Sequence, residues 1–447
     1  MKKQKKNKIQ IVFYVLWALY VLYVLLPDIS FAQRPLSLQD AIRIGLEQNH
    51  DVKIAIFKAK AVGDAKVNEL NANRLPSLRL NAYYLRLSDI GQPVIAVPNF
   101  PPISIPTYFV NNYSLKLSLL APVFNEIRRH EEDAAEFTAS AAQADIKTSQ
   151  STVVFTIKQQ YWNLYKLQKT LEAVNKNLEE ARAHLADVHS KLKEGTVLPN
   201  DTLKTLVQVS NAELKRIQTE KDIRVAMAAL MNTLGLPVTE QATLETSPIE
   251  SPARSEQVSS LIDKARQRRS ELAAISERIN AAQENIRMAR GGYYPQVAIM
   301  GNLYYQDPNQ RYFPAQNVFK ATWDASINLN WDLWTWNAAG YQAEQADLIM
   351  QQLQETKKQL EDAIALEVTQ NYLGVQTSAD QIRTAQLSVT QAAENLRVVN
   401  VQYTKGVAST TDVIDAETAA LQADVNLAAA EADANIAEAQ LEKSLGE

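Results

Sequence analysis

The most regular pattern in the chain is a strict alternation of apolar and polar residues over short segments. Between residues 323 and 333 every odd position is apolar and every even position is polar. The same alternation occurs over residues 113–119, and downstream of Pro295 the residues Val297, Ile299, Gly301 and Leu303 fall on one side of a strand. Because successive side chains of a β-strand point to opposite faces, this pattern predicts strands with one continuous apolar face. We therefore expect two β-hairpins, at about residues 76–124 and 295–334.

Between these segments lie long stretches without helix breakers. Residues 125–194 contain neither Gly nor Pro, and a second run, from Asn337 to Lys405, is interrupted only by Gly340 and Gly374. Apolar residues recur in the first run at spacings of three and four, as in Val153, Ile157, Tyr161, Leu164 and Leu167. This spacing predicts helices packed against other helices, and at about 1.5 Å per residue the first would be roughly 100 Å long. The helices predicted after the hairpins span residues 125–194, 201–234, 337–405 and 409–445.

The chain also repeats itself. A shift of 211 residues superimposes four identical pairs: Tyr161 on Tyr372, Gly195 on Gly406, Asp201 on Asp412, and Gly235 on Gly446. Further upstream Pro76 matches Pro295 with a shift of 219, so the first half contains extra residues, which we place in the proline-rich loop 91–109. The predicted organisation is a first repeat at 33–237, a linker at 238–257 and a second repeat at 258–447. Each repeat runs helix, β-hairpin, very long helix and shorter helix.

Aromatic residues gather at both ends of the predicted strands. Those beside the loops are Tyr113, Tyr304, Tyr305 and Trp323, and those beside the helices are Phe124, Tyr293, Tyr294, Trp331, Trp334 and Trp336. Two aromatic belts flanking strands of about ten residues are typical of outer-membrane barrels, whereas a water-exposed sheet, which also alternates, is the alternative. Four strands in lipid would leave unpaired edges, so the chain must oligomerise. Two copies give eight strands with a filled interior, and three give twelve strands with a lumen.

The amino terminus has the features of an export signal. A basic start, MKKQKKNK, precedes an apolar stretch and the small residues Ser30 and Ala32, which predicts a signal peptide at 1–32 cleaved after Ala32. A retained anchor helix is the alternative, because the apolar run is just long enough to span a bilayer. Cleavage removes five lysines and Asp28, which takes the formal net charge from −4 to −8. An acidic exported chain argues against a nucleic-acid partner.

Enzyme chemistry finds no support in the motifs. His184 and His189 are five residues apart and do not share a helical face, and the HEED segment at His130 lacks the second histidine of a zinc helix. The chain has no cysteine, glycine-rich phosphate loop or nucleophile elbow. We therefore predict no catalytic residue, cofactor or metal, and interpret these histidines as part of a solvated helix surface.

Several segments carry a family resemblance. The opening LSLQDAIRIGLEQNHDVKIA, the strand starts LPSL and YPQV, and YTKGVASTTDVIDAE resemble the TolC family of outer-membrane efflux channels over residues 35–447. The resemblance implies a mainly α fold with membrane β-structure: a homotrimer with a twelve-stranded barrel in outer-membrane lipid, continued by a long periplasmic α-helical barrel with the linker in its equatorial region. It also implies a passive duct of a tripartite efflux or type I secretion system, with a periplasmic adaptor (membrane fusion) protein and an inner-membrane transporter as partners. A periplasmic coiled-coil adaptor or structural protein without a pore is the alternative, and the exported substrate stays open.

The same resemblance assigns roles to four residues. Asp412 and Asp415 match aspartates of the narrow periplasmic entrance, where a trimer would stack two rings of carboxylates that raise one another's pKa and attract cations. Capping of a helix N-terminus is the alternative for these residues. Tyr403 and Asp201 match gate contacts between neighbouring helix pairs.

Two departures from the family pattern follow. The family's gate arginine is replaced by Ala408, which predicts a less firmly locked closed state unless Lys405 substitutes. The segments PVFNEIRR and DLWTWNAAG lack the glycines that many relatives have directly after the strand. The geometry of these strand-to-helix transitions is therefore left open.

Overall fold

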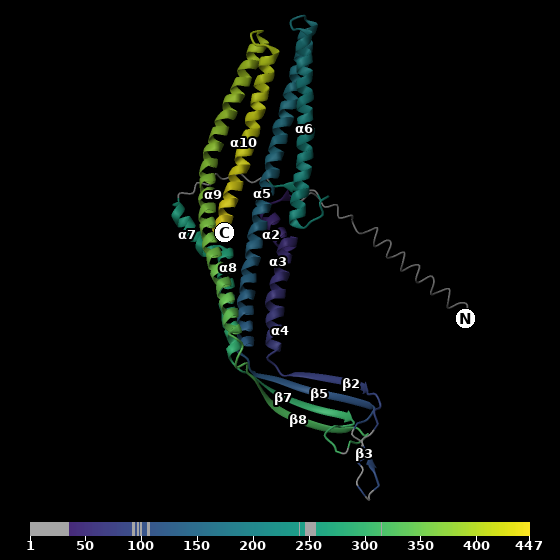
Figure 1. Ribbon diagram of the computed structural model, residues 1–447. Helices are drawn as coiled ribbons and strands as arrows, with labels where there is room; N and C mark the ends of the chain where they lie inside the picture. Colours follow the sequence, from purple (N-terminus) through teal and green to yellow (C-terminus); the bar gives the residue numbers. More distant parts are fainter. Residues whose placement is uncertain are drawn as a thin grey trace, which may run out of the picture. The chain divides into compact units, whose positions relative to one another are not determined.

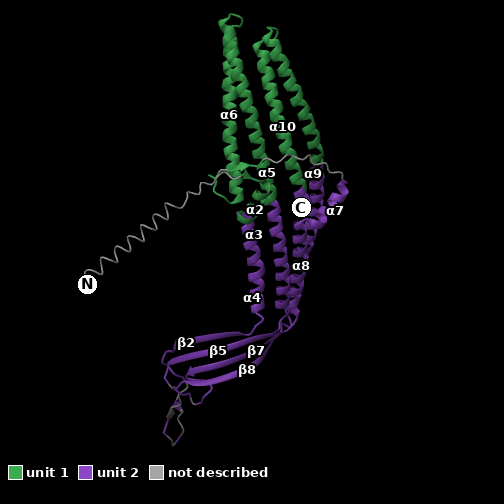
Figure 2. Ribbon diagram, turned by 180° about the vertical axis from the view of Figure 1, so that it is seen from behind, with its two compact units in different colours: residues 1–49, 153–255, 373–441 green, residues 50–152, 256–372, 442–447 purple. Residues whose placement is uncertain are grey.

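The computed structural model describes residues 35–91, 94, 95, 98, 101–104, 108–240, 242–245, 256–313 and 315–447. The predicted signal peptide lies outside this part of the chain. The fold divides into two compact units, each assembled from three separate stretches of sequence (Figure 2). Unit 1 comprises 1–49, 153–255 and 373–441, and unit 2 comprises 50–152, 256–372 and 442–447.

The long helices pair as antiparallel hairpins in unit 1 (Figure 1). Their bounds are α5 (Glu126–Lys193), α6 (Pro199–Leu234), α9 (Ala338–Thr404) and α10 (Thr410–Leu445). The first parts of α5 and α9 belong to unit 2. The core of unit 1 contains fully buried side chains of α5 and α6, including Ile157, Leu164, Leu230 and Leu234.

Unit 1 also contains a short parallel ribbon that joins the start of the described chain to the inter-repeat segment. Strand β1 (Pro35–Leu36) pairs with β6 (Thr243–Leu244), and helix α2 (Leu38–Gln48) follows β1. The buried Tyr161 hydroxyl of α5 donates toward the carbonyl of Glu245 at 2.7 Å, with the carbonyl of Leu36 at 3.3 Å. Part of the predicted linker is therefore a strand held by α5.

Unit 2 contains short helices and a four-stranded antiparallel sheet. The helices are α3 (His50–Lys60), the π-helix η1 (Ala61–Ala65), α4 (Lys66–Ala72), α7 (Val258–Arg268), α8 (Ser270–Arg290) and the 3₁₀ turn η2 (Gly291–Tyr293). The sheet strands are β2 (Ser77–Arg86), β5 (Asn111–Phe124), β7 (Gln296–Asp307) and β8 (Lys320–Asn330), in the order β2-β5-β7-β8. A separate two-stranded ribbon pairs β3 (Val94–Ile95) with β4 (Ile103–Ser104).

The helix predicted at the start of each repeat is broken at one residue in both repeats. Asn49 separates α2 from α3, and Arg269 separates α7 from α8, an offset of 220 residues. At Pro76 and Pro295 the offset is 219, so the first repeat holds one extra residue between these points. A π-helix accommodates one additional residue in a helical turn, and η1 lies within this interval.

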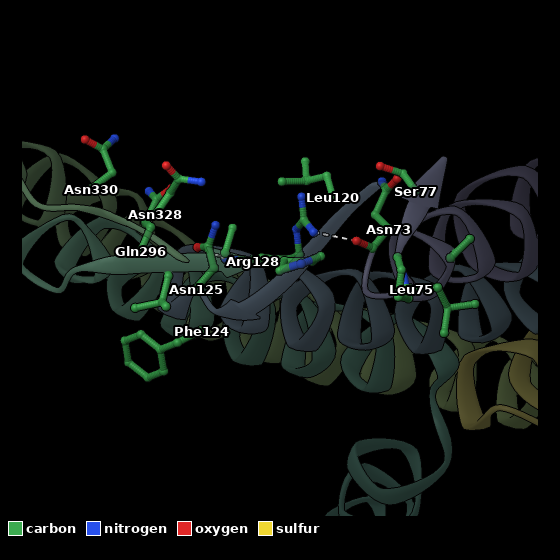
Figure 3. Close-up of a pocket in the computed structure, with 15 residues that line it drawn as sticks. Asn73, Leu75, Ser77, Leu120, Phe124, Asn125, Arg128, Gln296, Asn328 and Asn330 are labelled. Atoms are coloured by element: carbon green, nitrogen blue, oxygen red, sulfur yellow. Dashed lines mark hydrogen bonds between the residues drawn. The ribbon is translucent and has the colours of Figure 1, made fainter. Parts of the chain in front are cut away.

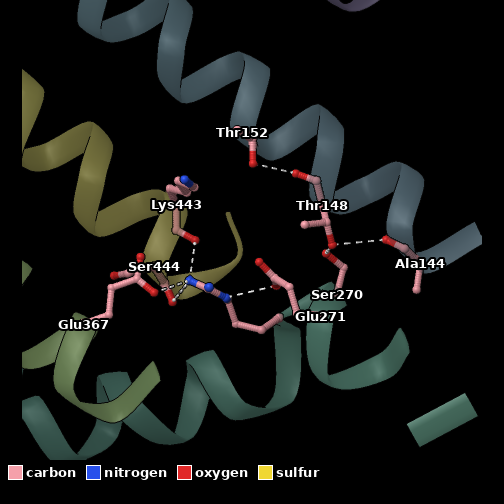
Figure 4. Close-up of polar contacts among 9 residues, drawn as sticks. Ala144, Thr148, Thr152, Ser270, Glu271, Glu367, Lys443 and Ser444 are labelled. Atoms are coloured by element: carbon pink, nitrogen blue, oxygen red, sulfur yellow. Dashed lines mark hydrogen bonds and ion pairs between the residues drawn. The ribbon is translucent and has the colours of Figure 1, made fainter. Parts of the chain in front are cut away.

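Each break residue binds the end of the last helix of its repeat. The Asn49 amide donates to the carbonyl of Thr233 at 2.8 Å in unit 1. In unit 2 the Arg269 guanidinium reaches the carbonyls of Lys443 and Ser444 and forms ion pairs with Glu271 and Glu367 (Figure 4). Carbonyl groups in the last turn of a helix lack intrahelical partners, so both side chains satisfy groups that the helix leaves open.

The sheet separates apolar from polar side chains across its two faces. Directly opposed residues share a face, and one face carries the rows Leu78–Leu119–Gly301–Ala325, Leu80–Leu117–Leu303–Trp323 and Ala82–Leu115–Tyr305–Ala321. The other carries Arg79–Ser118–Asn302–Asp324, Asn81–Lys116–Tyr304–Thr322 and Tyr83–Ser114–Gln306–Lys320. Within the described residues, no helix combines the length and apolar character needed to cross a bilayer.

The strand-to-helix transitions use asparagine where the resemblance led us to look for glycine. After β5, the Asn125 side chain accepts a hydrogen bond from the Arg128 N–H at 3.1 Å and caps α5. After β8, Trp336 and Asn337 both have positive φ angles, of 52° and 62°. The Asn337 side chain accepts the Tyr293 hydroxyl proton at 2.8 Å. Asparagine tolerates the left-handed region better than most residues, which accounts for its use here.

Candidate functional site: the helix-hairpin turns and the polar face of the sheet

Both helix hairpins of unit 1 end in the same tight turn. In the second hairpin Gly406 has φ of 74°, and the Val407 N–H donates to the Gln402 carbonyl at 2.9 Å. In the first, Gly195 also has φ of 74°, and Thr196 donates to Lys191 at 3.0 Å. These are the bonds of a glycine-terminated helix, and only glycine takes this conformation without strain. The turns set the positions of all four predicted site residues.

Asp412 caps the first turn of α10. Its carboxylate accepts hydrogen bonds from the Ser409 N–H at 2.7 Å and the Ser409 hydroxyl at 2.8 Å. These bonds favour the charged form and lower the pKa of Asp412, because the backbone N–H and then the hydroxyl of Ser409 stabilise the anion. The capping interaction that the sequence left as an alternative is thus present in the single chain. Asp412 remains exposed, as does Asp415 one turn further along.

Asp201 has the corresponding position in the first hairpin. Its carboxylate accepts the Leu198 N–H at 3.2 Å. Three residues later, Lys204 donates to the Thr411 hydroxyl of α10 at 3.1 Å. This bond places a cation beside the first turn of α10, close along the sequence to Asp412. The sequence interpretation did not single out Lys204, although its alignment with Asp415 under the 211-residue shift was visible.

Tyr403 is buried inside its own chain. It packs with Val188 and Val413, its ring lies 5.0 Å from that of His184, and the Lys191 ammonium lies 3.7 Å from its ring centroid. Among the described residues its hydroxyl has no hydrogen-bond partner. Ala408, at the position of the family's arginine, packs against the same cluster. The contact with Asp201 of a neighbouring copy remains a prediction.

Two buried titratable residues near these turns were missed or misread. His184 is 8% exposed, so its interpretation as a solvated surface residue is wrong, and burial lowers the pKa of its imidazole. Glu417 is 3% exposed, and desolvation, with a smaller effect of Glu180, raises its pKa to about 7. Glu417 lies four residues after the buried Val413 and thus on an apolar face of α10, which is the signal that could have identified it.

His130 also lies in a polar cluster rather than on a solvated surface. In unit 2 its Nδ1 is 2.8 Å from a carboxylate oxygen of the buried Glu284, and its Nε2 is 3.4 Å from Glu126. Donor atoms of His130, Asp133 and Glu284 lie within 4.8 Å of one another, the spacing of potential cation ligands. Arg287 also pairs with Glu284, so an ion-pair network accounts for the arrangement.

The polar face of the sheet continues into an amide-lined cavity where the strands meet the start of α5. The cavity has a volume of about 330 Å³. Its polar lining includes Asn73, Asn125, Gln296, Asn328 and Asn330. The Arg128 guanidinium in this wall donates to the Asn73 carbonyl (Figure 3). A polar surface therefore extends from the strands to the helices within unit 2.

These features define a class of protein. A duplicated chain of long helical hairpins is joined to a sheet whose apolar face carries charge only at the loop ends of its strands, at Arg86 and Asp307. Among the described residues, the sheet also has two edge strands with one unpaired edge each, and this is the architecture of a membrane channel subunit. The family model described as outer membrane efflux protein matches residues 41–236 and 261–447. The chain belongs to this outer membrane efflux protein family.

Individual relatives agree with this assignment. The chain is 21% identical over 319 residues to the outer membrane protein TolC of Vibrio cholerae serotype O1, a match that covers 70% of this chain and 72% of that protein. The solved structure of VceC from Vibrio cholerae has a TM-score of 0.73 at 18% identity, with 92% of this chain and 96% of VceC covered. The solved structure of the open-state MtrE channel of Neisseria gonorrhoeae has a TM-score of 0.73 at 17% identity, with 92% of this chain and 88% of MtrE covered.

The family assignment confirms several of the sequence predictions. The chain is an outer-membrane efflux channel protein with a periplasmic helical extension, and its mainly α fold with a duplicated pattern is the one expected. Family members are transport conduits, so the prediction that the chain is not an enzyme is also confirmed.

Proposed function

We propose that three copies of the chain form a passive duct that completes a tripartite efflux or type I secretion system by docking a periplasmic adaptor protein and an inner-membrane transporter. The observation that carries the proposal is the sheet. Its apolar rows hold no charged residue, while β2 and β8 each have one edge without a partner among the described residues. Unpaired edges are not tolerated in hydrocarbon, so copies must pair β8 of one with β2 of the next.

The helices carry matching support for self-association. Exposed apolar residues on α6 include Leu203, Val207, Leu214 and Ile217, spaced by four, seven and three. On α9 the exposed Leu366, Leu373, Leu387 and Val401 are separated by multiples of seven. Repeats of seven with steps of three and four are the seams of packed helices, and in one chain these seams are uncovered. Neighbouring copies would cover them.

In this assembly the turns of the second hairpin surround the periplasmic entrance. Asp412 and Asp415 form rings of three carboxylates that attract cations, while Ser409 keeps Asp412 ionised as it caps α10. Tyr403 and Asp201 contribute contacts between neighbouring hairpins in the closed state. Because Ala408 supplies no charge, Lys191, Lys204 and Lys405 are cations available near this contact.

Two measurements test the assembly. Detergent extracts of outer membranes should contain a trimer by native mass spectrometry, and the purified trimer should conduct in planar bilayers. A species soluble without detergent and lacking conductance would favour the adaptor reading instead. That alternative leaves the uncharged apolar rows of the sheet without a use.

The entrance rings have their own test. Asp412→Asn combined with Asp415→Asn should raise anion permeation and weaken block by multivalent cations. Asp380→Asn, on the exposed middle of α9, is the matched control and should change neither property. Unchanged selectivity in the double variant would leave Asp412 with the capping role alone. Asp201→Asn should increase the resting conductance if the gate contact exists.

A further inference from the structure

The polar face of the sheet is cationic although the chain as a whole is acidic. On this face β2 carries Arg79 and β5 carries Lys116, with Lys320 at the start of β8. Asp324 is the acidic residue on this face within the four described strands. Formal net charge of the whole chain is −4, so the sign reverses locally.

The single acidic residue is already neutralised. Arg311, from the segment between β7 and β8, forms an ion pair with Asp324 at 2.5 Å, and the Asn302 amide donates to the same carboxylate at 2.7 Å. Arg311 also lies 5.4 Å from the ring centroid of Tyr304. The negative charge of Asp324 is therefore balanced by Arg311, and it does not neutralise the other cations on this face.

Lys116 and Arg79 have no comparable partner. Lys116 lies between Asn81 and Tyr304 in its row, and its ammonium is 5.2 Å from the Tyr304 ring centroid. Arg79 is opposite Ser118. Neither residue forms an ion pair with the described part of the chain. The Tyr304 ring lies near both Lys116 and Arg311, but Arg311 is balanced by Asp324, so Lys116 is the uncompensated cation at this ring.

We propose that Arg79 and Lys116 make the membrane-spanning part of the duct favour anionic solutes, so that the cargo class includes small molecules with exposed carboxylate, phosphate or sulfate groups. This inference rests on the proposed function, because closure of the sheet with its apolar face toward lipid turns the polar face toward the lumen. Arg79 and Lys116 of three copies then contribute six uncompensated cations to the lumen, in addition to Lys320 at the start of each β8. Charges on a pore wall bordered by low-dielectric material raise the local concentration of counter-ions.

The inference gives the duct two regions of opposite preference. The carboxylates of Asp412 and Asp415 act at the entrance, while Arg79 and Lys116 act along the membrane-spanning wall. An anionic solute would be opposed at the first region and favoured at the second. The second region therefore raises the concentration of such solutes within the membrane-spanning part once the entrance has opened, and it opposes the entry of cations from outside.

Reversal potentials of the reconstituted full-length trimer under a KCl gradient test the proposal. Arg79→Gln with Lys116→Gln should lower the chloride-to-potassium permeability ratio by about twofold at low ionic strength, where the Debye length is about 10 Å or more, and the change should shrink at 1 M salt. Arg86→Gln is the matched control, because Arg86 lies on the same strand with the opposite parity, on the face of Tyr84. Lys116→Arg keeps the charge and should keep the ratio.

The permeability ratios of these variants support or overturn the inference. An unchanged ratio in a double variant that still conducts would overturn the inference and leave the trimeric duct standing. An equal change in Lys116→Arg and Lys116→Gln would assign the effect to packing and would also overturn it. Absence of conductance in the unmodified trimer would remove the proposed function and this inference together. If the double variant does not assemble, the Lys116→Gln and Arg79→Gln single variants provide the same comparison.

Discussion

The two helix-hairpin turns have the same backbone and different chemistry. Each ends its first helix with a glycine at φ of 74° and begins its second helix with an aspartate that accepts the N–H three residues earlier. At equivalent positions the first hairpin has Leu198, Lys204 and Leu206, where the second has Ser409, Asp415 and Glu417. Duplication has therefore kept the residues that shape the turn, while the residues that set its charge have diverged.

The ends of the shorter helices show the same separation between geometry and chemistry. Gly235 and Gly446 end α6 and α10 with φ angles of 75° and 77°. A neutral amide, Asn49, binds the first helix end, and a charged guanidinium, Arg269, binds the second. The second repeat uses a buried ionic network where the first uses a hydrogen bond between a neutral amide and a carbonyl. Variants at these paired positions can test how far the repeats have diverged.

The largest expected effect is at Arg269, which is 8% exposed. Arg269→Met removes ion pairs with two glutamates and bonds to two carbonyls, and should cost about 3 kcal/mol in local stability. Asn49→Ala should cost about 1–2 kcal/mol, because the hydrogen bond to the Thr233 carbonyl is lost. Hydrogen exchange in the last turns of α10 and α6 measures both. The neighbouring Arg268, whose side chain is 55% exposed beside Glu447, is the control, and Arg268→Met should cost less than about 1 kcal/mol.

The glycines give the next effect. A Cβ on Gly235 would lie 2.6 Å from the carbonyl oxygen of Gln48, whereas a Cβ on Gly195 would meet nothing within 4 Å. Both have positive φ, so each alanine variant loses about 1–2 kcal/mol from strain. Gly235→Ala should lose about 1 kcal/mol more from the clash. Equal shifts of the two thermal midpoints would show that the packing of Gln48 on this turn contributes nothing.

Glu417 gives a pH-dependent effect that its counterpart Leu206 cannot give. The pKa of Glu417 is raised to about 7 from 4.5, so the folded chain binds more protons between these values and its stability falls as pH rises through this window. Glu417→Gln should flatten that dependence and stabilise the hairpin at pH 8 by about 1–2 kcal/mol, after allowance for screening. Hydrogen exchange of α10 at pH 5 and pH 8 tests this. If the stability of the Glu417→Gln variant depends on pH as before, another titratable group causes the loss of stability at high pH.

The smallest effect is expected at the two capping aspartates. Asp412→Ala removes two hydrogen bonds and Asp201→Ala removes one, so fraying at the start of α10 should increase more than at the start of α6. Because the pKa of Asp412 is lowered, its stabilisation is present above its ordinary value and is lost as pH falls through the lowered pKa. Amide exchange in the two first turns, measured at neutral pH, compares them. If the first turn of α6 in Asp201→Ala frayed more than the first turn of α10 in Asp412→Ala, Asp412 would not be the stronger cap.

Much of this protein could be predicted from local sequence. Alternation over residues 323–333 required a strand in that region, and the absence of Gly and Pro from 125–194 required a long helix, because both signals come from the geometry of a single element. The glycine and aspartate of each turn were also visible, since capping is decided within a few residues. The roles of Asp201, Tyr403, Asp412 and Asp415 came from the family resemblance instead, and these roles remain predictions.

Tertiary structure decided what distant segments do to one another. The pairing of β5 with β7 brings together residues almost two hundred positions apart, and the burial of His184 depends on α9 packing over α5. Local periodicity does not report on such contacts, because the free energy of burial depends on which partner covers a side chain. For the same reason the cationic character of the sheet's polar face became visible only once the register had placed Arg79, Lys116 and the neutralised Asp324 side by side on one surface.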